Sequence, residues 1–452
     1  MSKYTVTISL MLLLMLGLLR AQILVPKTEN VYGGRMSWIA TLPVDSQTTR
    51  IFVSTESPNS MFYADIVHTT PIAFGTFNPV PDFDGDDGFG QNVHYFVVDS
   101  TTGYFVASIL GQLYVGNEKA GSRKQIETPE VTGLGEFAGT IFYTKAYHPD
   151  TVEFHMGTLD PSSGMFLESG GAPFYLNIPG IDNMPLQLYV NPVNKRVYFF
   201  VQMTPVQVWA TTVPYDSLSN SSAVTAISLP SLSGINFTAF GIAPDGRLFL
   251  GSEEGTPPAH FKFIAYSDDE GASWDTVGTG IGGTSSGTFA FAGDSSQYTI
   301  YFGTGFSPNK GYAGSWHWLG ERGFMTHPND GSIAVDPHDP AVVYLTSDLG
   351  LAASVDSGYG TFEIVDGIEA VKVWDLEMDT RNSTGWVASK SGIRKVENYG
   401  SSSESWDLFY PMGDGAPYTS IAVDPQHPDT AYAGNMRLYR TMDGGMMWDR
   451  VF

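Results

Sequence analysis

The stretch Ser332-Ile-Ala-Val-Asp336-Pro-His-Asp-Pro-Ala-Val-Val-Tyr-Leu-Thr-Ser returns later in the chain as Ser420-Ile-Ala-Val-Asp424-Pro-Gln-His-Pro-Asp-Thr-Ala-Tyr-Ala-Gly. The anchors Asp336 and Asp424 lie 88 residues apart, and a weaker copy at Asp379 divides that interval almost in half. The chain therefore repeats a unit of about 44 residues. Fainter equivalents precede these three units, near Asp294, Asp245, Asn191, His148, Asp99 and Asp45.

Each unit contains four short apolar runs separated by turns rich in Gly, Asp, Asn or Pro. Four strands in about 45 residues are typical of a propeller blade, whereas the repeats of a solenoid are usually shorter and more regular. We therefore predict an all-β protein, a β-propeller of four-stranded antiparallel blades, about seven to nine in number. Eight or nine units exceed most single rings, which leaves three alternatives: a spurious unit, a large ring, or a two-ring assembly.

The first residues are typical of a signal peptide. A cationic start precedes an apolar run from Ile8 to Leu19, which is shorter than the about 20 residues that span a bilayer. We expect a signal peptide at 1–21 and the propeller at 22–452, with an aberrant blade around 290–330. The predicted protein is secreted, has no membrane span, and contains no cysteine for disulfides or Cys-ligated metals.

The charge of the chain limits its partners. Its 47 acidic and 23 basic residues give a net charge of −24. Nucleic acids and anionic membranes are bound by basic surfaces, so both are excluded as expected partners.

A second motif, Ser-x-Asp-x-Gly-x-x-Trp, occurs at the same phase of three units, after the third strand. The Asp carboxylate of such a hairpin accepts bonds from backbone N–H groups of its own turn, the Gly supplies a positive φ, and the Trp covers the turn. We therefore predict structural roles for one full match and two variants, comprising Ser267, Asp269, Gly271 and Trp274; Asp356 and Gly358; and Asp443, Gly445 and Trp448.

This pattern resembles the Asp-box (BNR repeat) propellers, which include sialidases, xyloglucan-active endoglucanases, sortilin-type receptor domains and photosystem assembly factors. The resemblance covers 240–452 well and 35–240 only by period. Propellers have many activities, so the resemblance implies a fold more firmly than a function. The arginine motif of sialidases is missing, since Arg50-Ile-Phe has the wrong third residue.

Similarity to the endoglucanases implies catalytic acids just after the second strand of a blade. Glu56 and Asp348 occupy that phase here. Two such carboxylates could act as acid and base if about 6.5–9.5 Å separated them. Both also lie where non-enzymatic propellers carry an acid as a turn residue.

The segment 305–330 replaces the expected hairpin of its unit and is rich in aromatic residues. Trp316 and Trp318 share one face of a predicted strand, with Tyr312 and Arg322 nearby. Aromatic planes beside polar groups are suited to sugar stacking or to a protein contact. A core role for both tryptophans, between blades, is the slightly preferred interpretation.

The acidic loop containing Asp82, Asp84 and Asp86 resembles a calcium loop, but its Gly comes one position late and no Glu follows at the required distance. A solvated turn is the preferred interpretation, with calcium as the alternative and no other cofactor expected. We predict a secreted binding or scaffold module for a polysaccharide or an extracellular protein, with a glycoside hydrolase as the alternative.

Overall fold

The computed structural model describes residues 31–56, 60–83, 93–127, 130–220, 222–252, 262–279, 288–302, 305–310, 333–347, 350–409, 411 and 417–452. The predicted signal peptide lies outside these residues. Within them the structure is almost entirely β, with one 3₁₀ turn at Tyr215–Ser217. No helix in the described part is long and apolar enough to cross a membrane.

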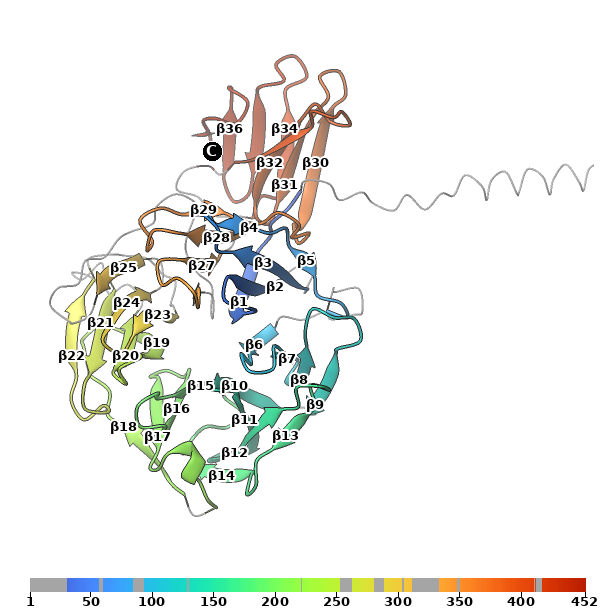
Figure 1. The fold of residues 1–452 in the computed structure, drawn as a ribbon. Helices are drawn as coiled ribbons and strands as arrows, with labels where there is room; N and C mark the ends of the chain where they lie inside the picture. Colours follow the sequence, from blue (N-terminus) through green and yellow to red (C-terminus); the bar gives the residue numbers. More distant parts are fainter. Residues whose placement is uncertain are drawn as a thin grey trace, which may run out of the picture.

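The strands form nine antiparallel sheets, each made from consecutive strands (Figure 1). The first four sheets comprise β1 (Met36–Pro43), β2 (Thr48–Thr55), β3 (Met61–Val67), β4 (Ala73–Phe74) and β5 (Asn78–Pro79); β6 (Val93–Val98), β7 (Phe105–Ile109), β8 (Gln112–Gly116) and β9 (Lys124–Glu127); β10 (Val131–Phe137), β11 (Thr140–His148), β12 (Thr151–Leu159), β13 (Phe166–Glu168) and β14 (Phe174–Asn177); and β15 (Leu186–Val190), β16 (Val197–Val201), β17 (Gln207–Thr211) and β18 (Val224–Ile227).

The next three sheets comprise β19 (Phe237–Ile242), β20 (Leu248–Ser252), β21 (Phe263–Ser267) and β22 (Asp275–Gly278); β23 (Phe289–Asp294), β24 (Gln297–Phe302) and β25 (Gly305–Lys310); and β26 (Ile333–Val335), β27 (Val343–Thr346), β28 (Leu351–Ser354) and β29 (Phe362–Glu363). The last two comprise β30 (Val373–Asp379), β31 (Thr384–Ser389), β32 (Gly392–Glu397) and β33 (Ser405–Phe409); and β34 (Ser420–Val423), β35 (Ala431–Gly434), β36 (Leu438–Thr441) and β37 (Asp449–Arg450).

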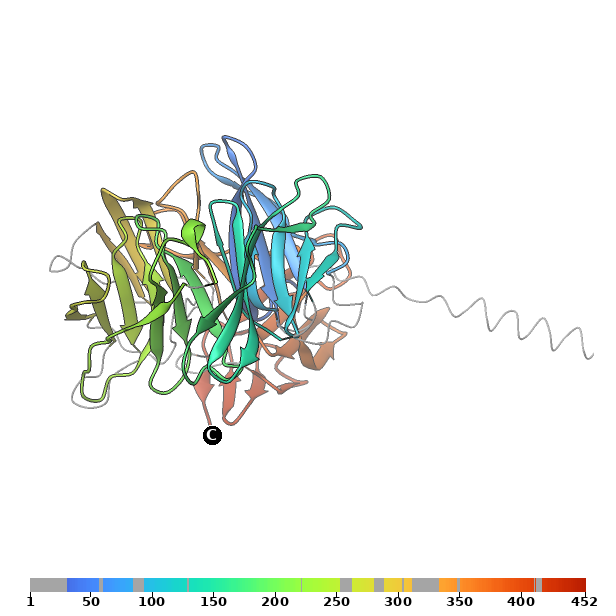
Figure 2. The ribbon, with the colours of Figure 1, turned by 90° about the horizontal axis from the view of Figure 1, so that it is seen from below.

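Seven of these sheets close a ring. Each inner strand contacts the inner strand of the next sheet, from β1 and β6 round to β23 and β26, and β1 then contacts β26 and β27. The β30–β33 and β34–β37 sheets pack on each other outside this ring, and we call them the outer unit (Figure 1). Figure 2 shows the strands of the ring running from one face of the ring to the other. The fold is a β-propeller, as predicted.

Stacking of neighbouring sheets explains the burial pattern. Strands β7, β16, β20 and β27 are buried at every position. Each is the second strand of its sheet, with apolar neighbours on both faces, so its sequence is a continuous apolar run instead of an alternating one. The hydrophobic clusters accordingly combine residues of adjacent sheets. In one cluster, for example, Ile51 and Val53 of the first sheet pack with Tyr344 of the seventh.

The repeat anchors lie in the turn between the first and second strands of their sheets, as Asp245, Asp336 and Asp424 show. His148 is an exception, because it ends the second strand of its sheet. The faint repeat predicted there was therefore out of phase. In the aberrant unit the structure describes three strands, β23–β25.

A buried carboxylate joins the first and seventh sheets where the ring closes. Asp336 accepts hydrogen bonds from Thr49 Oγ1 at 2.9 Å and from the Tyr344 hydroxyl at 2.6 Å. His68 Nε2 of the first sheet lies 3.1 Å from the same carboxylate. Among the described strands, none of either sheet pairs with a strand of the other, so this polar cluster adds to apolar packing in holding the ring closed.

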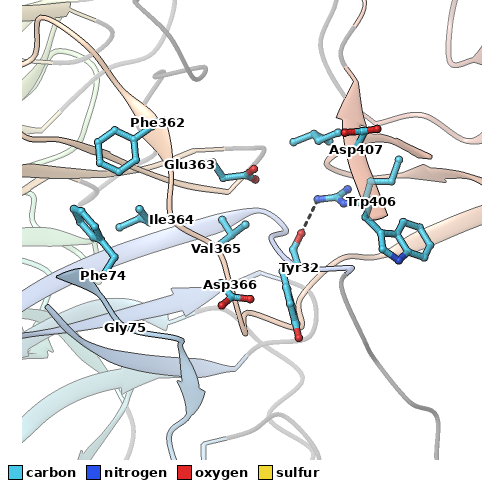
Figure 3. A pocket seen from close by; sticks show the side chains of 12 residues that line it. Tyr32, Phe74, Gly75, Phe362, Glu363, Ile364, Val365, Asp366, Trp406 and Asp407 are labelled. Carbon is cyan, nitrogen blue, oxygen red and sulfur yellow. Dashed lines mark hydrogen bonds between the residues drawn. The ribbon is translucent and has the colours of Figure 1, made fainter. Parts of the chain in front are cut away.

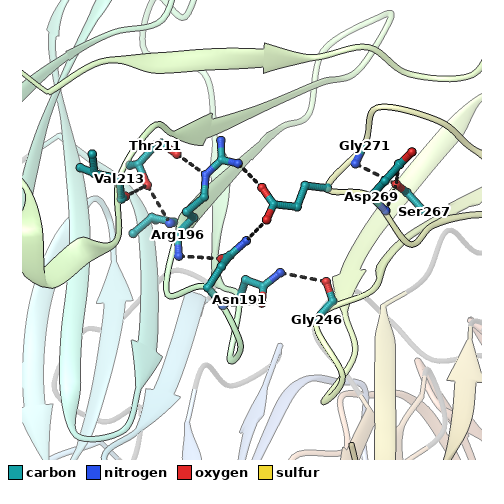
Figure 4. A network of polar contacts seen from close by, with 11 residues as sticks. Asn191, Arg196, Thr211, Val213, Gly246, Ser267, Asp269 and Gly271 are labelled. Carbon is teal, nitrogen blue, oxygen red and sulfur yellow. Dashed lines mark hydrogen bonds and ion pairs between the residues drawn. The ribbon is translucent and has the colours of Figure 1, made fainter.

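A second polar network joins the fourth and fifth sheets (Figure 4). Glu270 accepts a hydrogen bond from Asn194 Nδ2 at 2.9 Å and pairs with Arg196 Nη1 at 2.5 Å. Asn191 Nδ2 also donates to Gly246 O at 2.8 Å. Here the repeat anchor itself, Asn191, bonds to the next sheet.

Candidate functional site

Two glycines bring the segment before β1 against residues 368–370, the connection that leads from the ring to the outer unit. Gly33 N donates to Ile368 O at 2.8 Å, and both Gly33 and Gly34 have positive φ, at 108° and 112°. A Cβ on Gly34 would lie 2.0 Å from Ala370 O. Only glycine combines this backbone conformation with so close an approach, so the Tyr-Gly-Gly sequence positions the junction.

Glu56 lies at this junction between two cations. Lys390 Nζ, in the turn between β31 and β32, is 2.7 Å from Glu56 Oε1. Arg35 Nε, just before β1, is 3.0 Å from Oε2, without the alignment of a hydrogen bond. The carboxylate that the sequence identified as a catalytic candidate thus also links the ring to the outer unit.

The peptide group between Arg35 and Met36 is hydrogen-bonded both to Glu56 and to Ser347, the residue before Asp348. The carbonyl of Arg35 accepts from Glu56 N at 2.9 Å, and the next N–H, that of Met36, donates to Ser347 O at 3.1 Å. The C=O and N–H of a trans peptide point in opposite directions. Glu56 and Ser347 therefore flank this peptide, roughly 10 Å apart at two strand spacings. Asp348 itself lies outside the described residues.

A pocket of about 450 Å³ opens along the same junction (Figure 3). Phe74 and Phe362, whose ring centroids lie 5.3 Å apart, line it from the ring, and Trp406 and Asp407 line it from the outer unit. The remaining lining residues are Tyr32, Gly75, Glu363, Ile364, Val365, Asp366, Arg394 and Leu408. The pocket thus has aromatic, acidic and basic walls contributed by two separate stacks of sheets.

Arg394 is the most buried charged group of this pocket. It is 3% exposed. Its three hydrogen bonds go to neutral oxygens, namely Ser389 Oγ at 3.0 Å, Ser391 O at 2.8 Å and Tyr32 O at 2.9 Å (dashed in Figure 3). Burial lowers the pKa of Arg394 to about 10, although the charge of Glu363 acts in the opposite direction. A guanidinium has five N–H donors, and three of them are used in these bonds.

Glu363 faces this cation from the ring side of the pocket. Solvent reaches its side chain through the pocket, but the surrounding walls partly desolvate the carboxyl and raise its pKa. The described structure has no ion pair within 4.0 Å between Glu363 and Arg394. Two opposite charges therefore share one concave site without direct contact, a combination that marks candidate functional sites.

The boxes at the third-to-fourth strand turns have the predicted hairpin bonds. Ser267 Oγ donates to Asp269 Oδ1 at 2.8 Å, and the same carboxylate oxygen accepts from Ser273 N at 2.8 Å. Bonds from the hydroxyl and backbone of Ser273 lower the pKa of Asp269 to about 2. Asp356 accepts from Gly360 N, and Asp443 accepts from Met447 N, both at 2.9 Å.

The box tryptophans cover neighbouring elements. Trp274 Nε1 donates to Ser228 O at 2.8 Å, and Trp448 packs edge-on against Trp386, with ring centroids 5.9 Å apart. The glycines Gly271, Gly358 and Gly445 all have positive φ. The box residues are thus engaged in contacts within their own hairpins and with neighbouring elements.

Most of the other residues predicted to bind a ligand or a metal ion are not tested by the structure. Tyr312, Trp316, Trp318, Arg322, Asp84 and Asp86 lie outside the described residues. Asp82 accepts a hydrogen bond from Gly121 N at 2.7 Å and so supports a neighbouring loop. The part of the chain that the structure describes contains no group of three His, Asp or Glu side chains arranged to hold a metal ion, and calcium at 82–86 stays a prediction.

Four residues of the pocket were not predicted from the sequence, namely Glu363, Arg394, Trp406 and Asp407. Arg394 and the adjacent Lys395 are charged residues in β32, and both are buried there together with Ile393 and Val396. Nothing in the spacing indicates that this strand faces β29, because the two belong to different stacks of sheets.

No protein-family model matches the sequence, and no curated protein matches it. Among solved structures, the chain is similar to a GH74 enzyme from Niastella koreensis, with 13% identity and a TM-score of 0.58 over 93% of this chain and 66% of that one. It is also similar to the GH74 xyloglucanase from Xanthomonas campestris (12%, TM-score 0.55, 92% and 67%) and to an ancestral GH74 enzyme (11%, 0.54, 92% and 68%). The likeness shows the fold, and the chain spans about two thirds of the length of these enzymes.

Proposed function

We propose that this chain is an extracellular carbohydrate-binding propeller whose ligand occupies the junction pocket. The observation that carries the proposal is that Arg394 and Glu363, which have opposite charges, line the same pocket and form no ion pair with each other. A sugar hydroxyl can accept from the guanidinium and donate to the carboxylate, so it satisfies both groups at once. The signal-peptide pattern at 1–21 supports an extracellular location.

The other walls are suited to the same ligand class. Aromatic faces such as that of Trp406 pack against the C–H faces of sugars, and polar groups beside them fix orientation. Asp366 and Asp407 provide further acceptors for hydroxyl groups. With a net charge of −24, the chain is expected to repel polyanionic glycans.

A panel of polysaccharides tests this proposal by affinity electrophoresis. Wild-type protein is expected to be retarded by at least one neutral polysaccharide. Glu363→Ala and Asp407→Ala remove polar groups from opposite walls and should each reduce the retardation. Asp275→Ala, which removes an exposed carboxylate of β22 on the ring, is the matched control. Absence of retardation across a broad panel would refute the proposal.

Glycoside hydrolysis is the second candidate function. It is favoured by the Arg35–Met36 peptide, which holds Glu56 and the residue before Asp348 on opposite sides. In this second candidate function, Glu56 and Asp348 would act as the acid–base pair. An increase in reducing ends, abolished by both Glu56→Gln and Asp348→Asn, would establish this activity. Retardation without new reducing ends would leave binding as the function.

A further inference from the structure

Two exposed tyrosines lie against each other on the third sheet of the ring, Tyr147 in β11 and Tyr175 in β14. Their ring centroids are 4.7 Å apart, and the ring planes are inclined to each other by 54°. Tyr147 is 51% exposed and Tyr175 is 46% exposed. Solvent therefore reaches both phenols while their rings remain in contact, and we call these two residues the tyrosine pair.

The strands of the third sheet explain how the two rings meet. β12 pairs with both β11 and β14, so the two tyrosines belong to strands that lie roughly 10 Å, or two strand spacings, apart. The register between β11 and β12 shifts between Ala146 and His148, and Tyr147 occupies the irregular position. Such an irregularity redirects a side chain. The ring of His148 also packs edge-on against Tyr147, with centroids 4.6 Å apart, so this ring is held by two aromatic neighbours.

The other exposed tyrosines of the described structure differ from the tyrosine pair. Tyr359 and Tyr399 are 53% and 56% exposed, and neither ring contacts another aromatic ring in the described part of the chain. Tyr418 and Tyr439 do contact each other, with centroids 6.4 Å apart, but both are buried. Among the exposed tyrosines that the structure describes, only the tyrosine pair thus has one tyrosine ring against another.

We propose that the tyrosine pair is a site of oxidative cross-linking, at which hydrogen peroxide and a haem peroxidase join the two rings as dityrosine. Each phenol loses one electron and one proton and becomes a phenoxyl radical, whose unpaired electron is shared with the ring carbons beside the oxygen. Coupling of the two radicals forms one C–C bond. The hydrogen on each coupled carbon then moves to the oxygen of the same ring, which restores both phenols. The peroxide takes up the two electrons and two protons and becomes two molecules of water.

The contact between the rings favours a bond within one chain. Groups that one molecule holds together react with each other far faster than the same groups on separate molecules. The chain contains no cysteine and so has no disulfide, the usual covalent link of proteins in oxidising surroundings. A bond between β11 and β14 should stabilise the fold as a disulfide does, by restricting the unfolded chain. The reaction requires no ligand in the junction pocket, so it is independent of carbohydrate binding.

Treatment of the full chain, in dilute solution, with hydrogen peroxide and a haem peroxidase tests this proposal. The expected product is a monomer that has lost two hydrogen atoms in mass and has the blue fluorescence of dityrosine. Tandem mass spectrometry should place the new bond between the peptides that contain Tyr147 and Tyr175. The cross-linked protein is expected to have a higher Tm than the untreated protein.

Tyrosine-to-phenylalanine variants distinguish the tyrosine pair from the other exposed tyrosines. Tyr147→Phe and Tyr175→Phe each keep a ring but remove a phenol, so each should abolish the product without changing the circular dichroism. Tyr359→Phe and Tyr399→Phe, at positions of similar exposure, should leave the yield unchanged. A wild-type chain that forms no intramolecular product, or only cross-linked dimers, would overturn the proposal. So would a bond that maps to other residues.

Discussion

Glu136 illustrates how one side chain makes stability depend on pH. Burial raises the pKa of Glu136 to about 7; a hydrogen bond from Gly139 N opposes this shift and the charge of Asp99 adds to it. In the unfolded chain the carboxyl releases its proton near the ordinary glutamate pKa of 4.5. Stability from this group is therefore present below about 4.5 and is lost as the pH rises towards 7.

Glu136→Gln is expected to increase the free energy of unfolding at pH 8 by on the order of 3 kcal/mol, since one pKa unit corresponds to about 1.4 kcal/mol. At pH 4 it should have little effect, because both forms are then neutral. Urea unfolding at the two pH values measures the difference, with Asp275→Asn as the exposed control. Equal stabilisation at both pH values would contradict the assignment.

At the residue scale, hydrogen bonds within a single hairpin could be predicted from the sequence, whereas contacts between different stacks of sheets could not. The box bonds of Asp269 and Asp443 are formed within their own hairpins, so a short motif contains all the information needed. Glu363 and Arg394 belong to different stacks of sheets, and their proximity depends on how the outer unit packs on the ring. No local pattern encodes that packing.

Ring closure is tested at the element scale by comparing two equivalent repeats. Asp336→Asn leaves a buried site in which Thr49 and Tyr344 must donate to a weaker acceptor. Losing part of such a network costs about 1–3 kcal/mol. Asp424→Asn, at the same repeat position of the outer unit, changes a more exposed carboxylate and should cost less. Thermal unfolding of both variants gives the comparison, and equal losses would argue against a role for Asp336 in closure.

The junction glycines provide a second test at this scale. Gly34→Ala would place a Cβ against Ala370 O at 2.0 Å, whereas Gly121→Ala, also at positive φ, meets nothing within 4 Å. Both changes incur the backbone penalty, but only the first should displace the connection between the ring and the outer unit, at Ala370. Limited proteolysis is expected to cleave between ring and outer unit in Gly34→Ala alone. Similar cleavage of both variants would remove close approach as the explanation.

Strands and turns could be predicted from the sequence because the same pattern of apolar and turn residues recurs at the same position of successive repeats. The turn positions of Asp245, Asp336 and Asp424 agree with the period of the anchors. The repeat position predicted near His148 was wrong. Strands β11 and β12 are long, at nine residues each, so the turn between the first and second strands lies away from the position that the period predicts. The division between seven ring sheets and two outer sheets depends on curvature, which the repeat does not record.

The ion pair between Glu56 and Lys390 concerns the whole molecule, because it joins the ring to the outer unit. The Glu56 and Lys390 side chains are 24% and 23% exposed, so the pair is worth only about 1 kcal/mol or less. A double-mutant cycle of Glu56→Gln and Lys390→Gln should show coupling in the free energy of unfolding that fades in 1 M salt as charges are screened. Coupling that persists in high salt would indicate contact other than an ion pair.

The central claim is that the pocket between ring and outer unit binds carbohydrate. Isothermal titration with an oligosaccharide of the retained polysaccharide tests it most directly. Glu363→Ala and Asp407→Ala are each expected to weaken binding by about tenfold, equivalent to about 1.4 kcal/mol, while Asp275→Ala binds like wild type. Unchanged affinity in both pocket variants, with wild-type binding intact, would place the ligand elsewhere and contradict the account.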